Sequence, residues 1–194
     1  MSKQTSTEPL PHIHVVSSAL RQPDQPAATF RALDAAMKAV IGHKVLTVLL
    51  YHSDLQETER FYSSDLDAYP IAGRKDLRPT AWTKRLFTDQ QCYIGYTAAD
   101  IREFFLDHAL IHSLGCDAIL NVPVVYNSET LGTVNLLHEE GWYDKGDTEL
   151  AMTIANIAAP AYLQIRGGGR KTSVDFKNAV LFDADTQGAL ADPV

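Results

Sequence analysis

The feature that most constrains the fold is a pair of apolar segments near the end of the chain, residues 118–126 and 131–138. Val, Ile, Leu and Thr dominate both segments, and the polar residues NSET (127–130) separate them. Such a pattern predicts two antiparallel strands joined by a short turn. Each strand is apolar on both faces apart from one or two polar residues, which is typical of a sheet that is covered on both sides.

The length of the turn sets which side chains of the two strands share a face. A four-residue turn places residue 126 opposite residue 131, so that Asn121 shares a face with His138 and Asn135 lies on the other face. An unpaired amide inside an apolar strand costs roughly 1–3 kcal/mol. Unless a bulge intervenes, we therefore expect one asparagine at a pocket and the other bonded to a covering helix or loop, and the pattern leaves open which is which.

Composition limits the classes of protein to which the chain can belong. The 194 residues allow one domain of about 150 residues with terminal extensions. A formal charge of −7 gives no basic surface for nucleic acid or for an anionic membrane. The N-terminus lacks the apolar segment of a signal peptide, and the two cysteines are most simply reduced thiols. We expect a cytoplasmic protein with no nucleic-acid or membrane partner.

Periodicity and turn residues divide the chain into an N-terminal extension (1–26), a domain (27–166) and a tail (167–194) that begins with a three-glycine hinge. Helices are predicted at 27–41, 79–88, 100–114 and 144–166, with a bend at Pro160 in the last. Strands are predicted at 44–52, 59–63, 91–96, 118–126 and 131–138. This order, without regular alternation of strand and helix, indicates an α+β fold with an antiparallel sheet.

Residues 120–163, LNVPVVYNSETLGTVNLLHEEGWYDKGDTELAMTIANIAAPAYL, carry a resemblance to a known family. A VPV strand, a polar turn, an LGTVNLL strand, an aromatic-acidic break and a long closing helix together resemble the GAF domain family. The resemblance implies a six-stranded antiparallel sheet with the first and last helices on one face. It also implies a ligand pocket on the other face, roofed by loops and short helices between residues 65 and 115. Family members bind cyclic nucleotides, tetrapyrroles, amino acids or aromatic acids, and many dimerise through terminal helices, which implies a homodimer.

Polar and aromatic residues of the expected roof and hairpin are the candidates for ligand binding. Adjacent cations, Arg74 and Lys75, suit a carboxylate or phosphate, and Tyr69 and Trp82 suit the walls of a site for a planar ligand. The full candidate set is Tyr69, Arg74, Lys75, Trp82, His108, His112, Asn121, Asn135 and His138.

His108 and His112 lie four residues apart on a predicted helix and therefore on one face. A third ligand from His138 or Asp107 would complete a metal site. Because the chain has neither an HExxH motif nor a Cys/His quartet, we expect no metal and no other cofactor.

Two functions fit these residues. The first is a stand-alone GAF-like protein that binds a small anionic or aromatic metabolite and, as a sensor, signals through a partner protein. The alternative is an enzyme of the same fold that acts on a small polar or heterocyclic metabolite. In that case His138 or His112 is the general acid/base, and Glu139 or Asp107 orients it.

Overall fold

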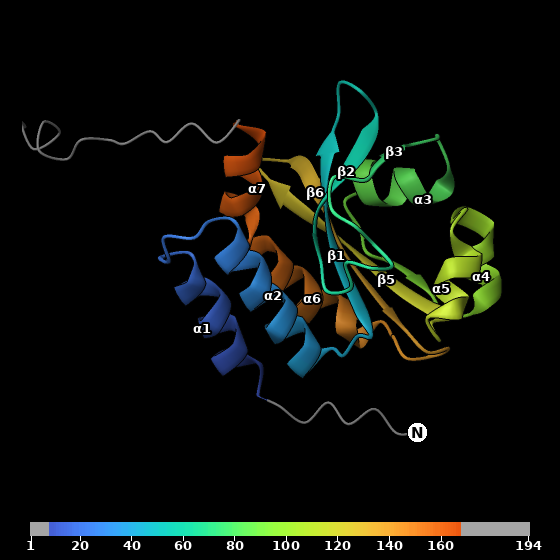
Figure 1. The fold of residues 1–194 in the computed structure, drawn as a ribbon, viewed down its shortest axis with the longest axis horizontal. Helices are drawn as coiled ribbons and strands as arrows, with labels where there is room; N and C mark the ends of the chain where they lie inside the picture. The colour runs from blue at the N-terminus through green and yellow to red at the C-terminus, as the bar shows by residue number, and fades with distance from the viewer. Residues whose placement is uncertain (1–7, 168–194) are drawn as a thin grey trace, which may run out of the picture.

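The computed structural model describes residues 8–167 and shows a six-stranded antiparallel sheet between two layers (Figure 1). The strands are β1 (Val45–His52), β2 (Glu57–Ser63), β3 (Arg74–Asp76), β4 (Tyr93–Gly95), β5 (Ala118–Tyr126) and β6 (Glu129–His138), in the spatial order β3-β2-β1-β6-β5-β4. One face is covered by a helix layer of α1 (Pro9–Ala19), α2 (Ala27–Val40), α6 (Gly146–Ile157) and α7 (Ala159–Arg166). The other is covered by a roof that contains α3 (Ala81–Thr83), the π-helix η1 (Lys84–Thr88), α4 (Ala98–Phe104), α5 (His108–Ser113) and the loop 64–73. The predicted fold class is confirmed.

The hairpin of β5 and β6 has the predicted strands but not the predicted register. A two-residue turn, Asn127-Ser128, joins them, and both residues have positive φ angles, 49° and 61°. The turn is two residues shorter than expected, and a β-bulge between Val124 and Val125 then shifts the pairing by one residue, so that Asn121 lies directly opposite Asn135 and His138 lies opposite Ala118. A shift of one residue exchanges the face of every partner side chain. The expectation that the two asparagines lie on opposite faces is therefore wrong.

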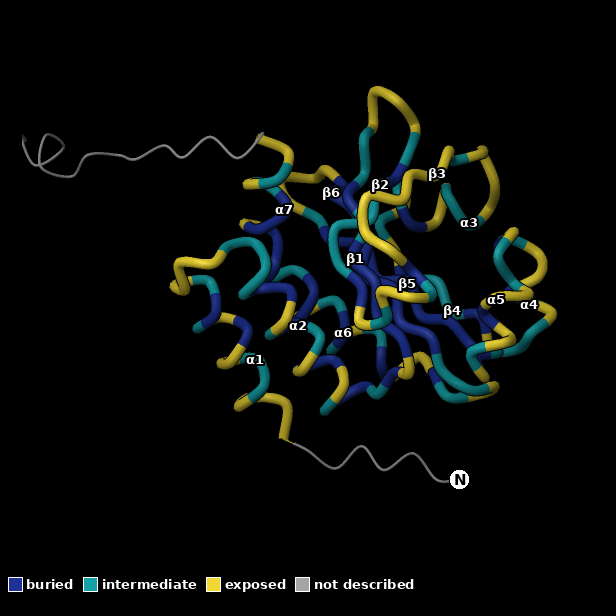
Figure 2. The backbone as a smooth tube through the Cα atoms, viewed as in Figure 1, coloured by how far each residue is buried: buried dark blue, intermediate teal, exposed yellow. Residues whose placement is uncertain are grey.

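The sheet face toward the helix layer forms the main apolar core. Nine inward side chains of the three central strands are at most 2% exposed, and all are apolar: Leu46, Val48, Leu50, Ala118, Leu120, Val122, Val124, Val134 and Leu136. They pack on the apolar stripe of α2, where Phe30, Leu33 and Met37 recur at helical spacing. Figure 2 shows the central strands as a mostly buried region between the helix layer and the roof.

Gly132 lets the helix layer approach β6 closely. A Cβ atom at this position would lie 2.0 Å from the backbone oxygen of Leu49 and 2.7 Å from the ring of Tyr162. The buried hydroxyl of Tyr162 donates to the backbone oxygen of Thr133 at 3.0 Å. Only glycine therefore allows α7 to dock on the sheet at this point.

Three predicted helices are interrupted. The closing helix divides at Ala158 into α6 and α7, because Pro160 lacks a backbone N–H and its ring excludes the carbonyl four residues earlier. The helix predicted over 100–114 divides at residues 105–107 into α4 and α5. The helix predicted over 79–88 is a single α-turn, α3, followed by η1. π-Turns are rare and frequently lie at functional sites.

The helix layer begins earlier than residue 27. Helix α1 lies within the segment that we assigned to the N-terminal extension, and it packs on α2 with Val16 fully buried. The glycine hinge and the tail beyond Gly167 lie outside the described residues. Within residues 8–167, none of the helices has the length and apolar character needed to cross a bilayer.

Candidate functional site

A cavity of about 80 Å³ lies between the sheet and the roof. We call it the roof cavity. Its volume is well below the roughly 300–1,000 Å³ of typical ligand pockets and corresponds to about three water molecules. The lining residues come from β1, β2, β3, β5, β6 and the roof: Val45, Thr47, Leu49, Thr58, Arg60, Tyr69, Lys75, Trp82, Phe105, Asp107, Ile111, Ile119, Asn121, Asn135 and Leu137. Tyr69, Lys75, Trp82, Asn121 and Asn135 are among the predicted ligand-binding residues.

A chain of side-chain hydrogen bonds crosses the floor of the cavity. The indole Nε1 of Trp82 donates to Asn121 Oδ1 at 2.9 Å, and Asn121 Nδ2 donates to Asn135 Oδ1 at 2.7 Å. Asn135 Nδ2 then donates to Thr47 Oγ1 at 3.4 Å. Asn121 and Asn135 are only 1% and 9% exposed. These hydrogen bonds therefore offset the free-energy cost of burying two amide groups in apolar strands.

Charged groups gather at the other end of the cavity. Tyr69 OH donates to Asp107 Oδ2 at 3.2 Å, and Lys75 Nζ lies 3.6 Å from Asp107 Oδ1. The guanidinium of Arg60 lies 4.8 Å over the Tyr69 ring and donates through Nη1 to Pro70 O at 3.0 Å. Burial lowers the pKa of Arg60 below its ordinary value, although the nearby Asp107 opposes that shift. Burial, assisted by the Asp107 carboxylate, raises the pKa of Tyr69, so its hydroxyl stays a donor.

Two polar atoms of these residues have no hydrogen-bond partner. Across residues 8–167, three buried side-chain polar atoms lack one: His43 Nδ1, Arg60 Nε and Asp107 Oδ1. Two of the three belong to residues that line the roof cavity. An unsatisfied buried group costs about 1–3 kcal/mol, and more when it is charged. Arg60 and Asp107 therefore each keep one buried atom without a hydrogen bond, and for Asp107 Oδ1 the Lys75 ammonium at 3.6 Å is an ion-pair contact only.

Arg74 lies outside the cavity, although its neighbour Lys75 lines it. The guanidinium of Arg74 pairs with Glu57 Oε1 at 2.5 Å and with Glu59 Oε2 at 2.7 Å across the β2–β3 pair. Successive residues of a strand point to opposite faces, so only one of two adjacent cations can reach the roof side. The structure places Lys75 there and Arg74 on the solvent side, where it is neutralised.

His138 also lies away from the roof cavity, on the helix-layer side of β6. Its ring stacks on Trp142 with centroids 3.6 Å apart, and Nδ1 accepts from the backbone N–H of Glu139 at 2.8 Å. Burial lowers the pKa of His138 to about 4, and the nearby cations Lys44 and Lys38 act in the same direction. The Glu139 carboxylate lies 3.7 Å from Lys44 Nζ at the surface. One residue of register error accounts for the difference from the predicted position.

His108 and His112 line a separate pocket of about 250 Å³ on the outer side of the roof, together with Arg102, Cys116 and Asp117. His112 is exposed, and its Nδ1 lies 2.8 Å from Asp117 Oδ1. Among the described residues, no group of three or more His, Cys, Asp and Glu side chains is arranged to hold a metal ion.

Both cysteines are buried. Burial raises the pKa of Cys92 to about 11 and also raises the pKa of Cys116 above its ordinary value. Neither thiol is activated as a nucleophile, because the thiolate is the reactive form.

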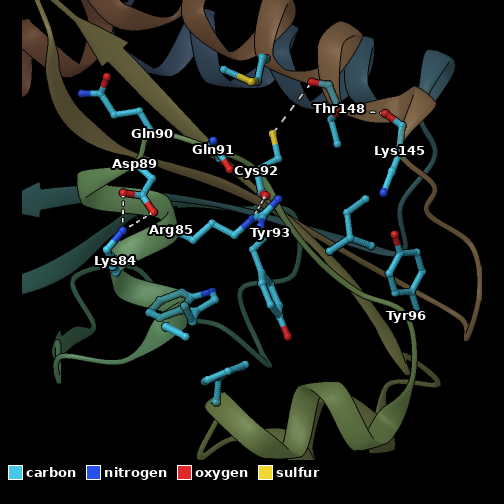
Figure 3. A pocket seen from close by; sticks show the side chains of 15 residues that line it. Lys84, Arg85, Asp89, Gln90, Gln91, Cys92, Tyr93, Tyr96, Lys145 and Thr148 are labelled. Atoms are coloured by element: carbon cyan, nitrogen blue, oxygen red, sulfur yellow. Dashed lines mark hydrogen bonds and ion pairs between the residues drawn. The ribbon is translucent and has the colours of Figure 1, made fainter.

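A larger cleft of about 980 Å³ runs beside the edge strand β4, between η1 and the start of α6 (Figure 3). Several of its polar groups already have partners: Lys84 Nζ lies 2.6 Å from Asp89 Oδ1, and Arg85 Nε donates to Cys92 O at 2.6 Å. The second bond occupies a backbone group of the segment leading into β4, and Tyr96 N just beyond the strand donates to Asp100 Oδ2 at 2.8 Å. These contacts occupy backbone groups next to the edge strand, which makes the edge less available for pairing with a strand of another chain. The cleft is larger than the roof cavity, but it contains none of the unsatisfied buried atoms.

Sequence reasoning missed Arg60, Thr47 and Phe105. Arg60 falls in the predicted strand 59–63, where a charged residue is normally read as solvent-facing. One signal was present: Thr58 and Arg60 are two residues apart, so both point to the roof side.

No protein-family model and no curated protein sequence matches the chain. Solved structures do match its fold. The GAF domain of phosphoenolpyruvate-protein phosphotransferase from Acinetobacter superposes with a TM-score of 0.67 at 11% identity, over 84% of this chain and 98% of that one. The corresponding domain from Coxiella burnetii gives 0.67 at 11%, over 83% and 96%. A phycocyanobilin-bound GAF domain from a cyanobacterial phytochrome gives 0.59 at 14%, over 83% and 98%.

Proposed function

Because the chain has the fold of GAF domains, we propose that it is a small-molecule-binding protein whose ligand occupies the roof cavity. The supporting observation concerns two residues that line this cavity on the roof side of the sheet. Arg60 and Asp107 each have one buried side-chain atom without a hydrogen-bond partner. A buried polar atom without a hydrogen bond costs stability, whereas a ligand that supplies the missing hydrogen bond gains affinity. The phycocyanobilin-bound relative carries a ligand in a domain of the same fold.

The acid–base alternative has little support in this geometry. Of its four named residues, only Asp107 lines the roof cavity, while His112, His138 and Glu139 lie elsewhere. The described lining residues include no histidine, cysteine or serine. General acid–base chemistry needs a base within hydrogen-bond reach of the reacting proton.

Nuclear magnetic resonance on ¹⁵N-labelled protein tests the proposal. A library of small polar metabolites is added singly, and the Trp82 indole and the Asn121 and Asn135 side-chain amides are followed. The Trp142→Phe variant assigns the two indole signals. We expect at least one compound to shift these three signals together. A library that leaves all three unmoved contradicts the proposed function.

A matched pair of variants locates the binding. Leu137→Phe places a ring in the cavity, whereas Leu137→Met keeps the side-chain volume nearly constant. We expect the phenylalanine variant to lose the ligand-induced shifts and the methionine variant to keep them. Binding that survives Leu137→Phe unchanged places the ligand elsewhere.

A further inference from the structure

The cleft beside β4 presents apolar surface that residues 8–167 leave partly uncovered. Its volume of about 980 Å³ is at the upper end of the roughly 300–1,000 Å³ of binding sites and is large enough for several side chains of a peptide segment. Tyr96 in the cleft is 41% exposed. Grouped apolar surface of this kind marks a binding surface. The aromatic and apolar side chains that line the cleft without being fully buried are Trp82, Tyr93, Ile94, Tyr96, Phe104 and Met152.

The charged side chains of the cleft leave it with a net positive charge. Its cations are Lys84, Arg85 and Lys145, and Asp89 is the one carboxylate among the described lining residues. Asp89 is already paired with Lys84 at 2.6 Å. Within residues 8–167, neither Arg85 nor Lys145 forms an ion pair, and both side chains are exposed. An apolar partner that also carries negative charge therefore complements this lining.

The end of α7 lies near one end of this cleft. Arg166, in the last turn of α7, pairs through Nη1 with Glu129 Oε2 at 2.9 Å. Gln90 Nε2 donates to the backbone oxygen of the preceding residue, Ser128, at 2.9 Å. Both contacts are thus made to the same turn of the β5–β6 hairpin. Figure 3 shows Gln90 at one end of the cleft and Lys145 at the other. The chain therefore leaves α7 close to the Gln90 end.

The sequence beyond Gly167 contains a segment of complementary chemistry. Residues 180–182 are Val-Leu-Phe, and two aspartates, Asp183 and Asp185, follow directly. Residues 178–194 contain no Lys, Arg or His. An apolar group followed by negative charge is the combination that the cleft lining favours.

The chain between α7 and this segment is long enough to reach the cleft. Residues 168–179 supply twelve residues, which can span at most about 40 Å. The cleft follows the chain from Gln90 to Tyr96, a length of about 20 Å if fully extended. Because the segment is tethered next to the cleft, its effective concentration there is on the order of millimolar, which favours binding within one molecule over binding to a second copy.

We propose that the cleft beside β4 is the docking site for residues 180–185 (VLFDAD) of the same chain. Leu181 and Phe182 cover the apolar surface around Ile94, and the two aspartates meet Lys145. The interaction needs no ligand in the roof cavity, so it is independent of the proposed function. Because Trp82 lines both the cleft and the roof cavity, the docked segment lies against a residue of the proposed ligand site.

A nitroxide spin label on the full-length chain tests the docking. Thr186→Cys introduces an accessible thiol for the label, since both native cysteines are buried. In ¹⁵N-labelled protein, we expect the backbone amides of Ile94, Tyr96 and Lys145 to lose most of their signal and to recover it when the label is reduced with ascorbate. The amides of β3, at the opposite edge of the sheet, should keep their signal.

Variants of the segment and of the cleft test the chemistry in the same spin-labelled protein. Replacing Leu181 and Phe182 together by serine should abolish the signal loss, and these changes lie outside the folded residues 8–167. Lys145→Glu should weaken the docking equilibrium about 2- to 10-fold, because it replaces an exposed ion pair by a repulsion.

A charge exchange and a matched control complete the set. Combining Lys145→Glu with Asp183→Lys and Asp185→Lys should restore the signal loss, because the charges are exchanged rather than removed. Arg21→Glu makes the same change in net charge at an exposed position after α1, away from the cleft, and should leave the signal loss unchanged.

Each contrary outcome overturns the proposal. The first is the absence of selective signal loss at the cleft. The second is signal loss that survives both the serine substitutions and Lys145→Glu. The third comes from mixing ¹⁵N protein that lacks the spin label with unlabelled-isotope protein that carries it. Signal loss at the cleft in that mixture means that the segment binds a second copy instead of its own chain.

Discussion

The two faces of the central sheet are built from alternate residues of the same strands, yet they differ in almost every physical property. On the helix-layer side, the nine inward residues of the central strands are apolar and at most 2% exposed. On the roof side, the same strands present Thr47, Asn121 and Asn135 among apolar residues, and a cavity remains above them. The helices of the helix layer have 8 to 14 residues, whereas those of the roof have 3 to 7 and are joined by loops.

We interpret this difference as a division of roles, in which the helix-layer face stabilises the fold and the roof face carries the proposed ligand site. The helix-layer side holds the larger of the two clusters of buried apolar side chains, and burial of apolar surface is the main favourable contribution to folding. The roof side keeps polar atoms in a poorly packed region, which costs stability unless a ligand satisfies them. Binding sites are commonly placed on loops that a rigid scaffold positions. The four predictions that follow test this division, beginning with the largest effect.

Adjacent leucines of β6 provide the most direct comparison. Leu136 faces the helix layer at 0% exposure, and Leu137 faces the roof cavity at 6%. We expect Leu136→Ala to lower the free energy of unfolding by about 3–4 kcal/mol and Leu137→Ala by about 2 kcal/mol, because Leu137 already borders unfilled space. Urea denaturation measures both values. Equal losses, or a larger loss for Leu137→Ala, contradict the division between the faces.

The second-largest change in stability is expected for the hydrogen-bonded asparagines on the floor of the roof cavity. Asn135→Leu removes the acceptor for Asn121 Nδ2 and leaves that buried donor unpaired. We expect the free energy of unfolding to fall by about 2 kcal/mol and the Trp82 indole signal to shift, since Asn121 loses its fixed orientation. Asn156, which bonds to Val125 N in the helix layer, offers a comparison: Asn156→Leu should leave the indole signal unmoved. If the Trp82 indole signal does not shift in Asn135→Leu, the hydrogen bonds from Trp82 through Asn121 to Asn135 are not coupled.

His138 gives the helix-layer side a pH dependence in the acidic range. Its pKa is about 4 in the folded protein and 6.5 as the ordinary value, so the unfolded chain binds the extra proton throughout that range. This contribution to stability is complete above pH 6.5 and is lost as the pH falls through about 4. Allowing for solvent screening at a partly buried ring, we expect a loss on the order of 1–2 kcal/mol.

Denaturation at pH 7 and pH 4 measures the slope. His138→Phe, which retains an aromatic ring against Trp142, should flatten it relative to the unmodified protein. Identical slopes for His138→Phe and the unmodified protein rule out this assignment.

The smallest effect is expected at Arg74. Its two ion pairs lie at the surface with the guanidinium about half exposed, and exposed pairs contribute roughly 0–1 kcal/mol. Arg74→Gln should therefore lower the free energy of unfolding by less than about 1 kcal/mol. A loss of more than about 2 kcal/mol would show that the β2–β3 pair depends on this network.

Local patterns were sufficient to predict five of the six strands and the helices after residue 27 of the helix layer, but not the short strand β3 or helix α1. The 3.6-residue stripe of α2 and the apolar alternation of β5 and β6 are properties of neighbouring residues. The register was not predictable in the same way. The sequence Asn127-Ser128 lacks the glycine that usually marks a two-residue turn, and a serine with positive φ is uncommon. The β-bulge between Val124 and Val125 also leaves no clear signal, and its one-residue shift places Asn121 opposite Asn135 and His138 on the helix-layer side.

The charged end of the roof cavity depends on contacts between distant parts of the chain. Arg74 was a reasonable candidate until β2 brought Glu57 and Glu59 against it. Arg60 becomes a roof residue only because β2 lies beside β1 with that face covered by the loop that carries Tyr69. Asp107 reaches the same place because the helix predicted over 100–114 breaks there. None of these pairings leaves a periodic signal in the sequence.

A single NMR titration tests the central claim that ligand binding belongs to the roof face alone. The metabolite library is added to ¹⁵N-labelled protein, and every backbone amide is followed together with the indole and asparagine side chains. The account predicts saturable shifts at Trp82, Asn121, Asn135 and the segment around Asp107, with α2 and α6 unchanged. Shifts confined to the helix layer, or none at the roof cavity with any compound of the library, would contradict it.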